Sequence, residues 1–301
     1  MTLRQDMLKA AHQADHVLED SAINVLQFIL DQQNPDGGFR GRSAFSDMYY
    51  TVFGLECIHA LKGPNLGLDI RDYLNQSGDP TELDLVHLAC LVRCWATVME
   101  LTGKSMTQPL RMKLLQQLES LRSPDGGFNT QSRDQDTNAY GCFMALGIYH
   151  DLQCDIPESD TLIEGLLTLQ RQAGGFANDR STEIGSTPAT AAALCVLHYL
   201  ADNVPSESVA WLLSQAHPQG GFAAVPVESP VVVPDLLSTA TAIHALSLVG
   251  ANIDLMRDAC LDYLDSLWDP QGAFKGSWLD ETLDCEYTYY GLLALGHLYQ
   301  D

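Results

Sequence analysis

The sequence contains few basic residues, and this scarcity excludes several classes of partner. Only 16 of its 301 residues are Lys or Arg, against 39 Asp or Glu, which gives a formal net charge of −23. A chain with this charge repels nucleic acid and anionic membrane surfaces. We therefore expect no nucleic-acid partner, and an anionic substrate would require a local cluster of basic residues.

The sequence also lacks paired cysteine motifs and long apolar runs. None of its eight cysteines stands in a Cys-x-x-Cys motif, and most lie in apolar stretches, where a reduced thiol packs as a small hydrophobic group. This usage is typical of a reducing compartment, so we expect a cytoplasmic protein. Residues 1–15 are polar, unlike a signal peptide, and are interpreted as a polar N-terminal extension. No transmembrane segment is expected.

A glycine-containing turn that ends in phenylalanine recurs along the chain. The phenylalanines are separated by 89, 48, 46 and 52 residues, so the first interval is about twice the others. This spacing predicts a repeat of about fifty residues, with one copy near 79–83 that lacks the motif. The turns occupy 35–39, 124–128, 173–176, 219–222 and 271–274.

Each turn lies between two segments with helical patterns, and no segment shows the alternation of a strand. Amphipathic segments precede the turns at 21–33, 108–122, 160–172, 206–217 and 255–268. More uniformly apolar, alanine-rich segments follow at 47–61, 84–101, 136–152, 186–200, 235–249 and 284–299. Residues 225–233 are apolar but contain prolines and are interpreted as a loop. The pattern predicts an all-α, α/α toroid in one domain, 1–301, with about six helical hairpins whose inner helices line a central cavity.

The predicted inner helices begin with residues that can cap them. These residues are Asp47, Asp84, Asp136, Ser186, Asp235 and Asp284. Their simplest role is to accept hydrogen bonds from the first free amides of each helix. Because all six would lie at one mouth of the cavity, an acid or a metal ligand among them is the alternative.

The turns, the repeat length and the sequence Asp-Met-Tyr-Tyr-Thr at 47–51 resemble the prenyltransferase and squalene-cyclase repeat family. The resemblance extends from about residue 21 to residue 299. Related rings occur in complement-type thioester domains, but their Cys-Gly-Glu-Gln motif is absent here. Two enzyme branches remain, the β subunits of protein prenyltransferases and the class II terpene cyclases.

The prenyltransferase resemblance implies an isoprenoid diphosphate in the cavity, a zinc ion and a helical-repeat α-type partner subunit. Arg42 matches the diphosphate-binding arginine, and Asp47 and His87 match two zinc ligands. Tyr49 stands where the family has the cysteine ligand, so at most weak zinc binding is expected. In the last repeat Glu286 takes the corresponding position.

The cyclase resemblance implies an aspartic acid that protonates a polyene. Asp134-Gln135-Asp136-Thr137 keeps the first and third Asp of the cyclase motif, and Asp136 would be the acid. A polar turn that ends in a helix cap is the alternative interpretation of these residues. Asp47 and Asp284, which begin the first and last predicted inner helices, are further candidate catalytic carboxylates.

Aromatic and basic residues concentrate in the first and last repeats, which are neighbours in a closed ring. The aromatic group predicts a surface for a prenyl chain or a carbocation, although core packing would also use such residues. The basic group predicts a phosphate contact, and exposed loop residues are the alternative. The candidate ligand-binding residues are Tyr49, Tyr50, Tyr140, Tyr287, Tyr290, Arg40, Arg42 and Lys275.

Three functions follow from these observations. The first is an isoprenoid-binding protein that resembles a prenyltransferase β subunit and transfers a prenyl group from an allylic diphosphate. The second is a small class II terpene cyclase with Asp136 as its acid. The third is a non-catalytic ring that binds a lipid or a protein.

Overall fold

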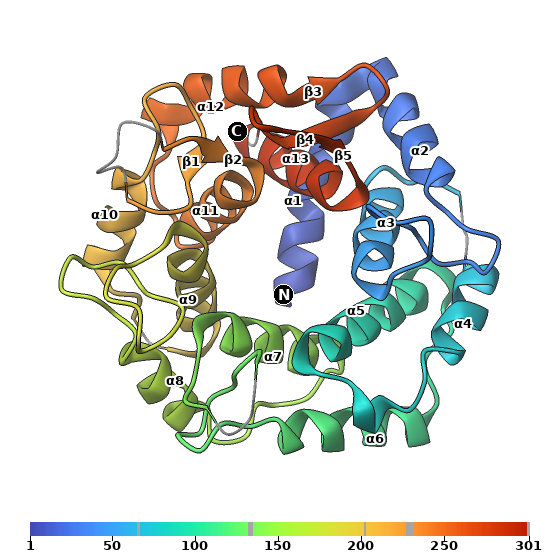
Figure 1. Cartoon of the computed structure of the whole chain (residues 1–301), viewed down its shortest axis with the longest axis horizontal. Helices are drawn as coiled ribbons and strands as arrows, with labels where there is room; N and C mark the ends of the chain where they lie inside the picture. The colour runs from blue at the N-terminus through green and yellow to red at the C-terminus, as the bar shows by residue number, and fades with distance from the viewer. Residues whose placement is uncertain (65–66, 132–134, 202, 227–231, 300–301) are drawn as a thin grey trace.

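The computed structural model describes residues 1–64, 67–131, 135–201, 203–226 and 232–299 and shows a closed ring of paired helices (Figure 1). The outer helices are α2 (Ala22–Asp31), α4 (Gly67–Asn75), α6 (Gln108–Ser120), α8 (Ser159–Leu167), α10 (Ser206–Ser214) and α12 (Asp254–Leu267). The inner helices are α3 (Met48–Ala60), α5 (Leu85–Thr102), α7 (Ala139–Asp151), α9 (Thr187–Leu200), α11 (Leu236–Leu248) and α13 (Cys285–Leu298). The predicted α/α toroid is confirmed.

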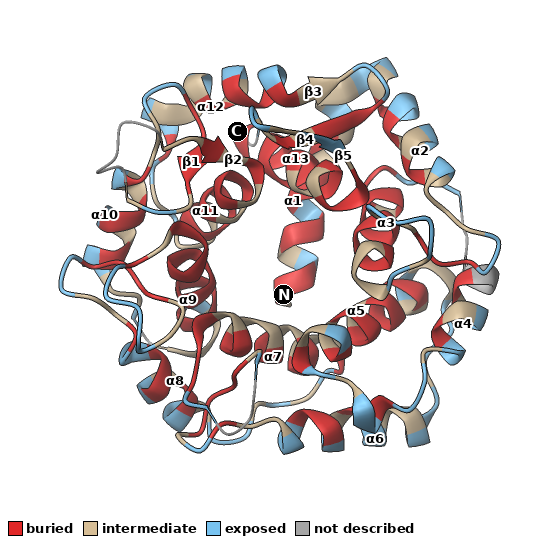
Figure 2. Cartoon of the chain, in the orientation of Figure 1, coloured by how far each residue is buried: buried red, intermediate tan, exposed pale blue. Residues whose placement is uncertain are grey.

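The ring closes because the last inner helix packs against the first. Each inner helix contacts the next one along the chain, and α13 contacts both α11 and α3. The inner helices are buried on most sides, as Figure 2 shows, whereas an outer helix buries one stripe. In α2 that stripe consists of Ala22, Val25 and Ile29, which recur at helical spacing.

The glycine-phenylalanine turns join the outer and inner helical layers. Their five phenylalanines are at most 2% exposed. Gly37 has φ 94°, a conformation that side chains with a Cβ rarely adopt. In the first turn the amide of Phe39 donates a 2.9 Å hydrogen bond to the hydroxyl of Thr51 in α3, so the turn is tied to the inner helix. The turns therefore set the spacing between the layers.

The second repeat lacks this turn, as the spacing predicts. A short 3-10 helix, Pro80–Glu82, stands in its place and leads into α5. Its outer helix, α4, was not assigned from the sequence. The nine residues of α4 form a short helix, which has few periods from which to detect a pattern.

Short strands, which the sequence did not predict, lie between the outer and inner helices of the last two repeats. They are β1 (Phe222–Ala223), β2 (Pro234–Asp235), β3 (Trp268–Asp269), β4 (Ala273–Ser277) and β5 (Asp280–Leu283), and all pairs are antiparallel. With two to five residues each, they are too short to show a clear alternation. Within the predicted loop 225–233, residues 227–231 lie outside the described part of the chain.

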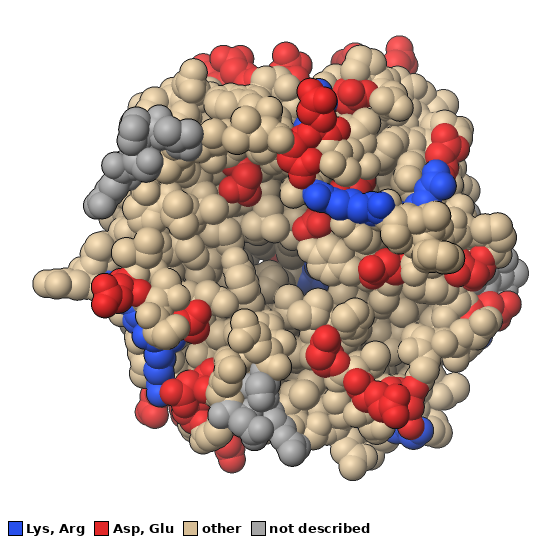
Figure 3. Space-filling view, viewed as in Figure 1, with Lys and Arg blue, Asp and Glu red and all other residues tan. Residues whose placement is uncertain are grey.

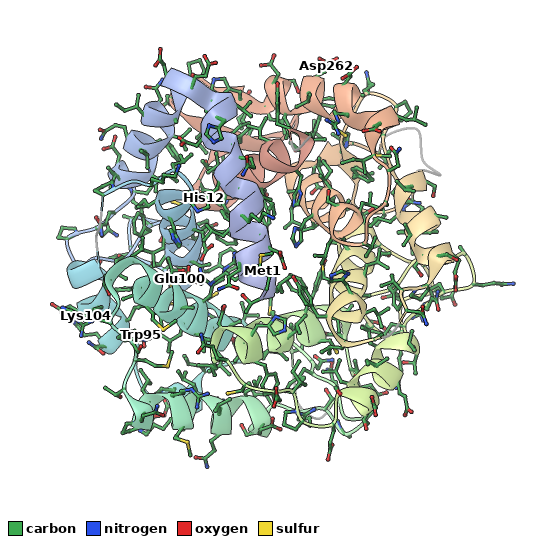
Figure 4. All side chains as sticks on the ribbon, turned by 180° about the vertical axis from the view of Figure 1, so that it is seen from behind. Met1, His12, Trp95, Glu100, Lys104 and Asp262 are labelled. Atoms are coloured by element: carbon green, nitrogen blue, oxygen red, sulfur yellow. The ribbon has the colours of Figure 1, made fainter. Side chains whose placement is uncertain are left out.

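The N-terminal residues form a buried helix, so their interpretation as a polar extension was wrong. Helix α1 (Leu3–Leu18) lies across the rear opening of the ring, and Figure 4 shows it from behind with Met1 near the centre. It packs against α3, α7 and α13. Ala10 lies very close to Gly296 of α13. A Cβ added at position 296 would come within 1.8 Å of the Ala10 carbonyl oxygen. Small residues thus let a mainly polar helix enter the ring.

Within the described residues, one helix, α5, is long and apolar enough to cross a membrane by length and composition alone, although the sequence predicts no transmembrane segment. Half of this helix is buried inside the structure. It is an inner helix packed between α3 and α7, and core helices of soluble proteins meet the same criteria.

Candidate functional site

The centre of the ring holds an apolar cavity, and Figure 3 shows the hollow at the middle of the front face. Two adjoining spaces of about 270 and 170 Å³ share part of their walls. Their size and lining are typical of a small-molecule site. The residues that line both spaces are Met7, Tyr49, Phe143, Met144, Thr241 and Tyr290.

A second, larger groove of about 840 Å³ lies on the outer side of the ring. Arg171, Glu183 and Trp211 are among its lining residues. It is more open than the central cavity and combines exposed polar and apolar groups. We place the candidate site at the ring centre, because an enclosed apolar space removes more of a ligand from water.

The aromatic residues of the first and last repeats meet in the cavity wall. The ring of Phe53 lies 5.1 Å from that of Tyr49 and 5.6 Å from that of Tyr290, in edge-to-face and tilted arrangements. Tyr140, from α7, lines the larger space. The structure thus brings Tyr49, Tyr140 and Tyr290 together around one cavity, where their faces can contact an apolar chain.

The other two candidate tyrosines surround Arg42 at the front of the ring. The guanidinium of Arg42 lies 5.6 Å from the centre of the Tyr287 ring, within the range of a cation–π contact. The ring of Tyr50 packs over Gly41, where a Cβ would come within 2.1 Å of it. Neither tyrosine is among the residues that line the two central spaces.

Arg42 is paired with two carboxylates. Its guanidinium lies 3.0 Å from Asp280 and 3.5 Å from Asp284. Asp284 is 1% exposed, and its Oδ1 accepts the amide hydrogen of Tyr287, so it caps α13 as predicted. Burial raises the pKa of Asp284, although the Tyr287 amide and Arg42 oppose the rise. The charge of Arg42 is therefore already balanced.

Glu286 lies between the carboxylates around Arg42 and the cavity wall. The hydroxyl of Tyr49 donates a 2.6 Å hydrogen bond to Glu286 Oε1. Burial raises the pKa of Glu286, the Tyr49 hydrogen bond lowers it, and the nearby charge of Asp284 raises it again. A carboxyl group that holds its proton to a higher pH than usual thus lies one hydrogen bond behind a residue of the cavity wall.

The two other predicted cations do not join Arg42 in its ion pairs. Arg40 donates to the side chain of Gln32 at 3.3 Å and to the carbonyl oxygen of Asp31 at 3.1 Å, at the end of α2. Lys275 lies in β4 opposite Leu283. In the described structure the junction of the first and last repeats therefore carries a carboxylate-rich group around a single arginine. The sequence placed the three cations in neighbouring loops, but it could not show which partners their side chains contact.

The two predicted zinc ligands have other partners. Asp47 caps α3 by accepting the amide hydrogen of Tyr49 at 2.8 Å. His87 lies 2.8 Å from Asp84, the cap of its own helix, and about half of its side chain is exposed. Across residues 1–64, 67–131, 135–201, 203–226 and 232–299, no three or more His, Cys, Asp or Glu side chains are grouped to hold a metal ion. The residues present do not fit the zinc site that the resemblance implies.

Asp136 lies in the loop before α7, and its assignment as the helix cap was wrong. Asn138 caps α7 instead, with its side chain accepting the amide hydrogen of Gly141 at 2.6 Å. The carboxylate of Asp136 is 52% exposed and forms a 2.7 Å ion pair with Arg180. Asp134, the first acid of the cyclase-like motif, lies outside the described residues.

A group of charged residues that the sequence patterns did not single out lies at the smaller central space, which Arg4, Arg93 and Asp151 help to line. Arg4 of α1 pairs with Glu56 of α3 at 3.6 Å and with Asp151 of α7 at 3.2 Å. Arg93 of α5 lies 3.6 Å from Glu56, which is fully buried and whose pKa is lowered by Arg93 and Arg4 against the effect of burial. A sequence signal existed, since Glu56 follows an apolar run in α3 and Arg93 stands in the apolar middle of α5.

The comparisons with known proteins agree with this fold. The type II terpene cyclase MstE from Scytonema, in a variant complexed with its substrate geranylgeranyl dihydroxybenzoate, superposes with a TM-score of 0.65, with 15% identity and coverage of 95% of this chain and 97% of that one. Protein geranylgeranyltransferase-I from Candida albicans, complexed with GGPP, superposes with a TM-score of 0.63. Its identity is 16%, and the match covers 96% of this chain and 91% of that one. An inactive variant of the α-1,6-mannanase GH76A of Salegentibacter, complexed with α-1,6-mannotriose, superposes with a TM-score of 0.59. Its identity is 12%, and the match covers 92% of this chain and 98% of that one.

At such low identities these likenesses show the fold alone, and the mannanase illustrates how different the chemistry inside one fold can be. No curated protein sequence matches the chain. The family model of the prenyltransferase alpha-alpha toroid domain matches residues 5–207 and 190–300, which together span nearly the whole sequence. The chain therefore belongs to the prenyltransferase alpha-alpha toroid family.

Proposed function

We propose that the central cavity binds an isoprenoid chain and that the protein protonates it, as a terpene cyclase does. The walls support the first part, because Tyr49, Phe143 and Tyr290 offer aromatic faces in an apolar space. The ligands in the solved structures of MstE and protein geranylgeranyltransferase-I include geranylgeranyl groups. A chain of that class is therefore the proposed ligand.

The observation that carries the second part is the hydrogen bond between Tyr49 and Glu286. A general acid must hold its proton until the substrate takes it, and burial raises the pKa of Glu286. The exposed Asp136, paired with Arg180, lacks such an environment. We therefore assign the acid role to Glu286 in place of Asp136.

The chemistry balances without a cofactor. Because Glu286 lies behind Tyr49, its proton reaches the substrate through the Tyr49 hydroxyl. That hydroxyl gives its hydrogen to one carbon of a terminal double bond while its oxygen takes the proton of Glu286. The π electrons form the new C–H bond, and the other carbon becomes cationic. Glu286 is left as a carboxylate, which the hydrogen bond from Tyr49 stabilises. Aromatic faces stabilise the cation while further double bonds attack it. The final cation loses a proton to water, and Glu286 takes up a proton from solvent, so the product is an isomer of the substrate.

Prenyl transfer fits the described residues less well. A leaving diphosphate needs uncompensated positive charge, and Arg42 already faces Asp280 and Asp284. The thiolate ligand of the transferase pattern is replaced by Tyr49, whose hydroxyl is engaged with Glu286. The α-type partner subunit stays a prediction from the resemblance.

The test is to incubate the protein with geranylgeraniol, geranylgeranyl diphosphate and geranylgeranyl dihydroxybenzoate and to analyse the products by mass spectrometry. We expect a product isomeric with its substrate, formed by the wild type and lost on Glu286→Gln. The matched variant Asp136→Asn should keep most of the activity. Loss of activity in Asp136→Asn alone would return the acid role to Asp136.

Two other results would overturn the proposal. Release of diphosphate with transfer of the prenyl group to an acceptor would make the protein a transferase. Tight binding of these ligands with no product would support the non-catalytic ring.

A further inference from the structure

Two histidines form a buried pair beside the cavity. His244 of α11 and His297 of α13 are 3% and 8% exposed, and His244 Nδ1 lies 2.9 Å from His297 Nε2. Their ring centroids are 5.1 Å apart. One hydrogen atom must lie between these two nitrogens, so each ring has one remaining nitrogen for another partner.

Those remaining nitrogens have no hydrogen-bond partner among the described residues. His244 Nε2 and His297 Nδ1 are both closed off from solvent and unpaired. Buried polar atoms are normally satisfied, and a nitrogen left unpaired in an apolar wall lowers stability. Because His244 lines the larger central space, a bound ligand is the nearest source of a partner.

The surroundings favour the neutral form of both histidines. Burial lowers the pKa of both histidines, to about 4 for His297, and the charge of Arg93 further disfavours protonation of His244. Two neutral imidazoles can share one hydrogen bond in two ways. If His244 donates from Nδ1, its free Nε2 is an acceptor. If both rings take the other tautomer, His297 donates from Nε2 and His244 Nε2 carries a hydrogen and is a donor. Such a group suits an uncharged oxygen and offers no positive charge to a phosphate.

His244 Nε2 exposes almost no surface to the cavity, so a ligand oxygen reaches it when neighbouring side chains of the wall move. Met7 and Met144 line the same space, and their unbranched side chains change conformation easily. Thr241, one turn before His244 on α11, lines both spaces and adds a hydroxyl. Its hydrogen is donated to the Leu237 carbonyl at 2.7 Å, so its oxygen is available as an acceptor.

We propose that His244, held in place by His297, recognises an uncharged oxygen of the isoprenoid ligand, so that the cavity selects an alcohol over the matching hydrocarbon. This inference rests on the proposed function, because it takes an isoprenoid to be the occupant. His297 acts through His244 and is a positioning residue.

The experiment measures the binding of geranylgeraniol and of its matching oxygen-free hydrocarbon by the wild type, His244→Phe and His244→Gln. The wild type should bind the alcohol about tenfold more tightly, the effect of one well-made hydrogen bond. His244→Phe should bind both ligands equally, and His244→Gln should recover part of the preference, since its amide can donate and accept. The control His16→Phe, an exposed position on α1, should behave as the wild type.

Imidazole ¹⁵N shifts give a second readout that does not depend on a folded variant. Adding the alcohol to the wild type should shift the His244 Nε2 signal, and the hydrocarbon should leave it unchanged. Equal affinity of the wild type for the two ligands, or no shift with the alcohol, would overturn the role of His244 while the isoprenoid cavity stands. Failure of the wild type to bind either ligand would overturn the proposed function itself.

Discussion

Tyr49 and Glu286 lie 237 positions apart in the sequence, yet the hydroxyl of one donates a 2.6 Å hydrogen bond to the carboxyl of the other. The bond joins α3 to α13 where the ring closes. Asp284, two residues before Glu286, is paired with Arg42, so the closure point also couples two buried carboxyl groups.

The stability of the protein should depend on pH through Glu286. Its pKa in the folded protein is raised above the ordinary 4.5, so the folded state binds this proton more tightly than the unfolded state. Its contribution to stability is therefore fully present below about pH 4.5 and is lost as the pH rises through the raised pKa. Urea unfolding of the wild type and Glu286→Gln from pH 4 to 8 is the measurement. The variant should lose less stability over this range, and identical slopes would show that the Glu286 pKa is not raised.

Arg42→Ala should move the alkaline limit of activity to higher pH. Arg42 lowers the pKa of both Asp284 and Glu286, so its removal lets the acid keep its proton longer. The pH profile of product formation is the measurement, with Arg40→Ala as the control. Calorimetry separates this role from diphosphate binding. If Arg42 contacted a diphosphate, its loss would weaken binding of geranylgeranyl diphosphate by about tenfold or more and spare geranylgeraniol.

Arg4→Met should destabilise the protein by about 3 kcal/mol, because it leaves Glu56 and Asp151 buried with less positive charge. Hydrogen exchange should show that α1 is the element released, since Arg4 anchors it to α3 and α7. Urea unfolding measures the loss. Lys9→Met, an exposed position on the same helix, should change stability by less than about 0.5 kcal/mol. Similar effects of the two variants would mean that the buried charges do not hold α1.

Gly220→Ala should be far more damaging than Gly250→Ala. Both glycines have positive φ, so each substitution introduces backbone strain of about 1 kcal/mol. A Cβ at position 220 would also come within 1.9 Å of the Ala259 carbonyl oxygen, whereas position 250 has open space. The added clash should bring the loss at position 220 to about 3 kcal/mol. Thermal or urea unfolding decides, and equal losses would show that α12 moves aside freely.

Local patterns in the sequence determined the ring itself. Repeated turns, one-sided outer helices and apolar inner helices act within a few residues of each other, and their regular spacing leads to a closed toroid. The sequence also placed Tyr49, Tyr140 and Tyr290 on inner helices that surround the cavity. It did not separate them from Tyr50 and Tyr287, which begin the same kind of helix but lie at Gly41 and Arg42.

Tertiary structure alone decided the partners of the charged and polar groups. Sequence placed Arg40 and Arg42 together, but Arg40 turns to the end of α2 while Arg42 turns to Asp280 and Asp284. The sequence pattern predicted that Asp136 caps the third inner helix, whereas the side chain of Asn138 caps α7 in the structure. A long, flexible side chain can reach several partners. The partner that it contacts depends on which helices, distant in the sequence, lie beside it. The polar composition of residues 1–15 likewise concealed α1, because its charges are compensated only inside the closed ring.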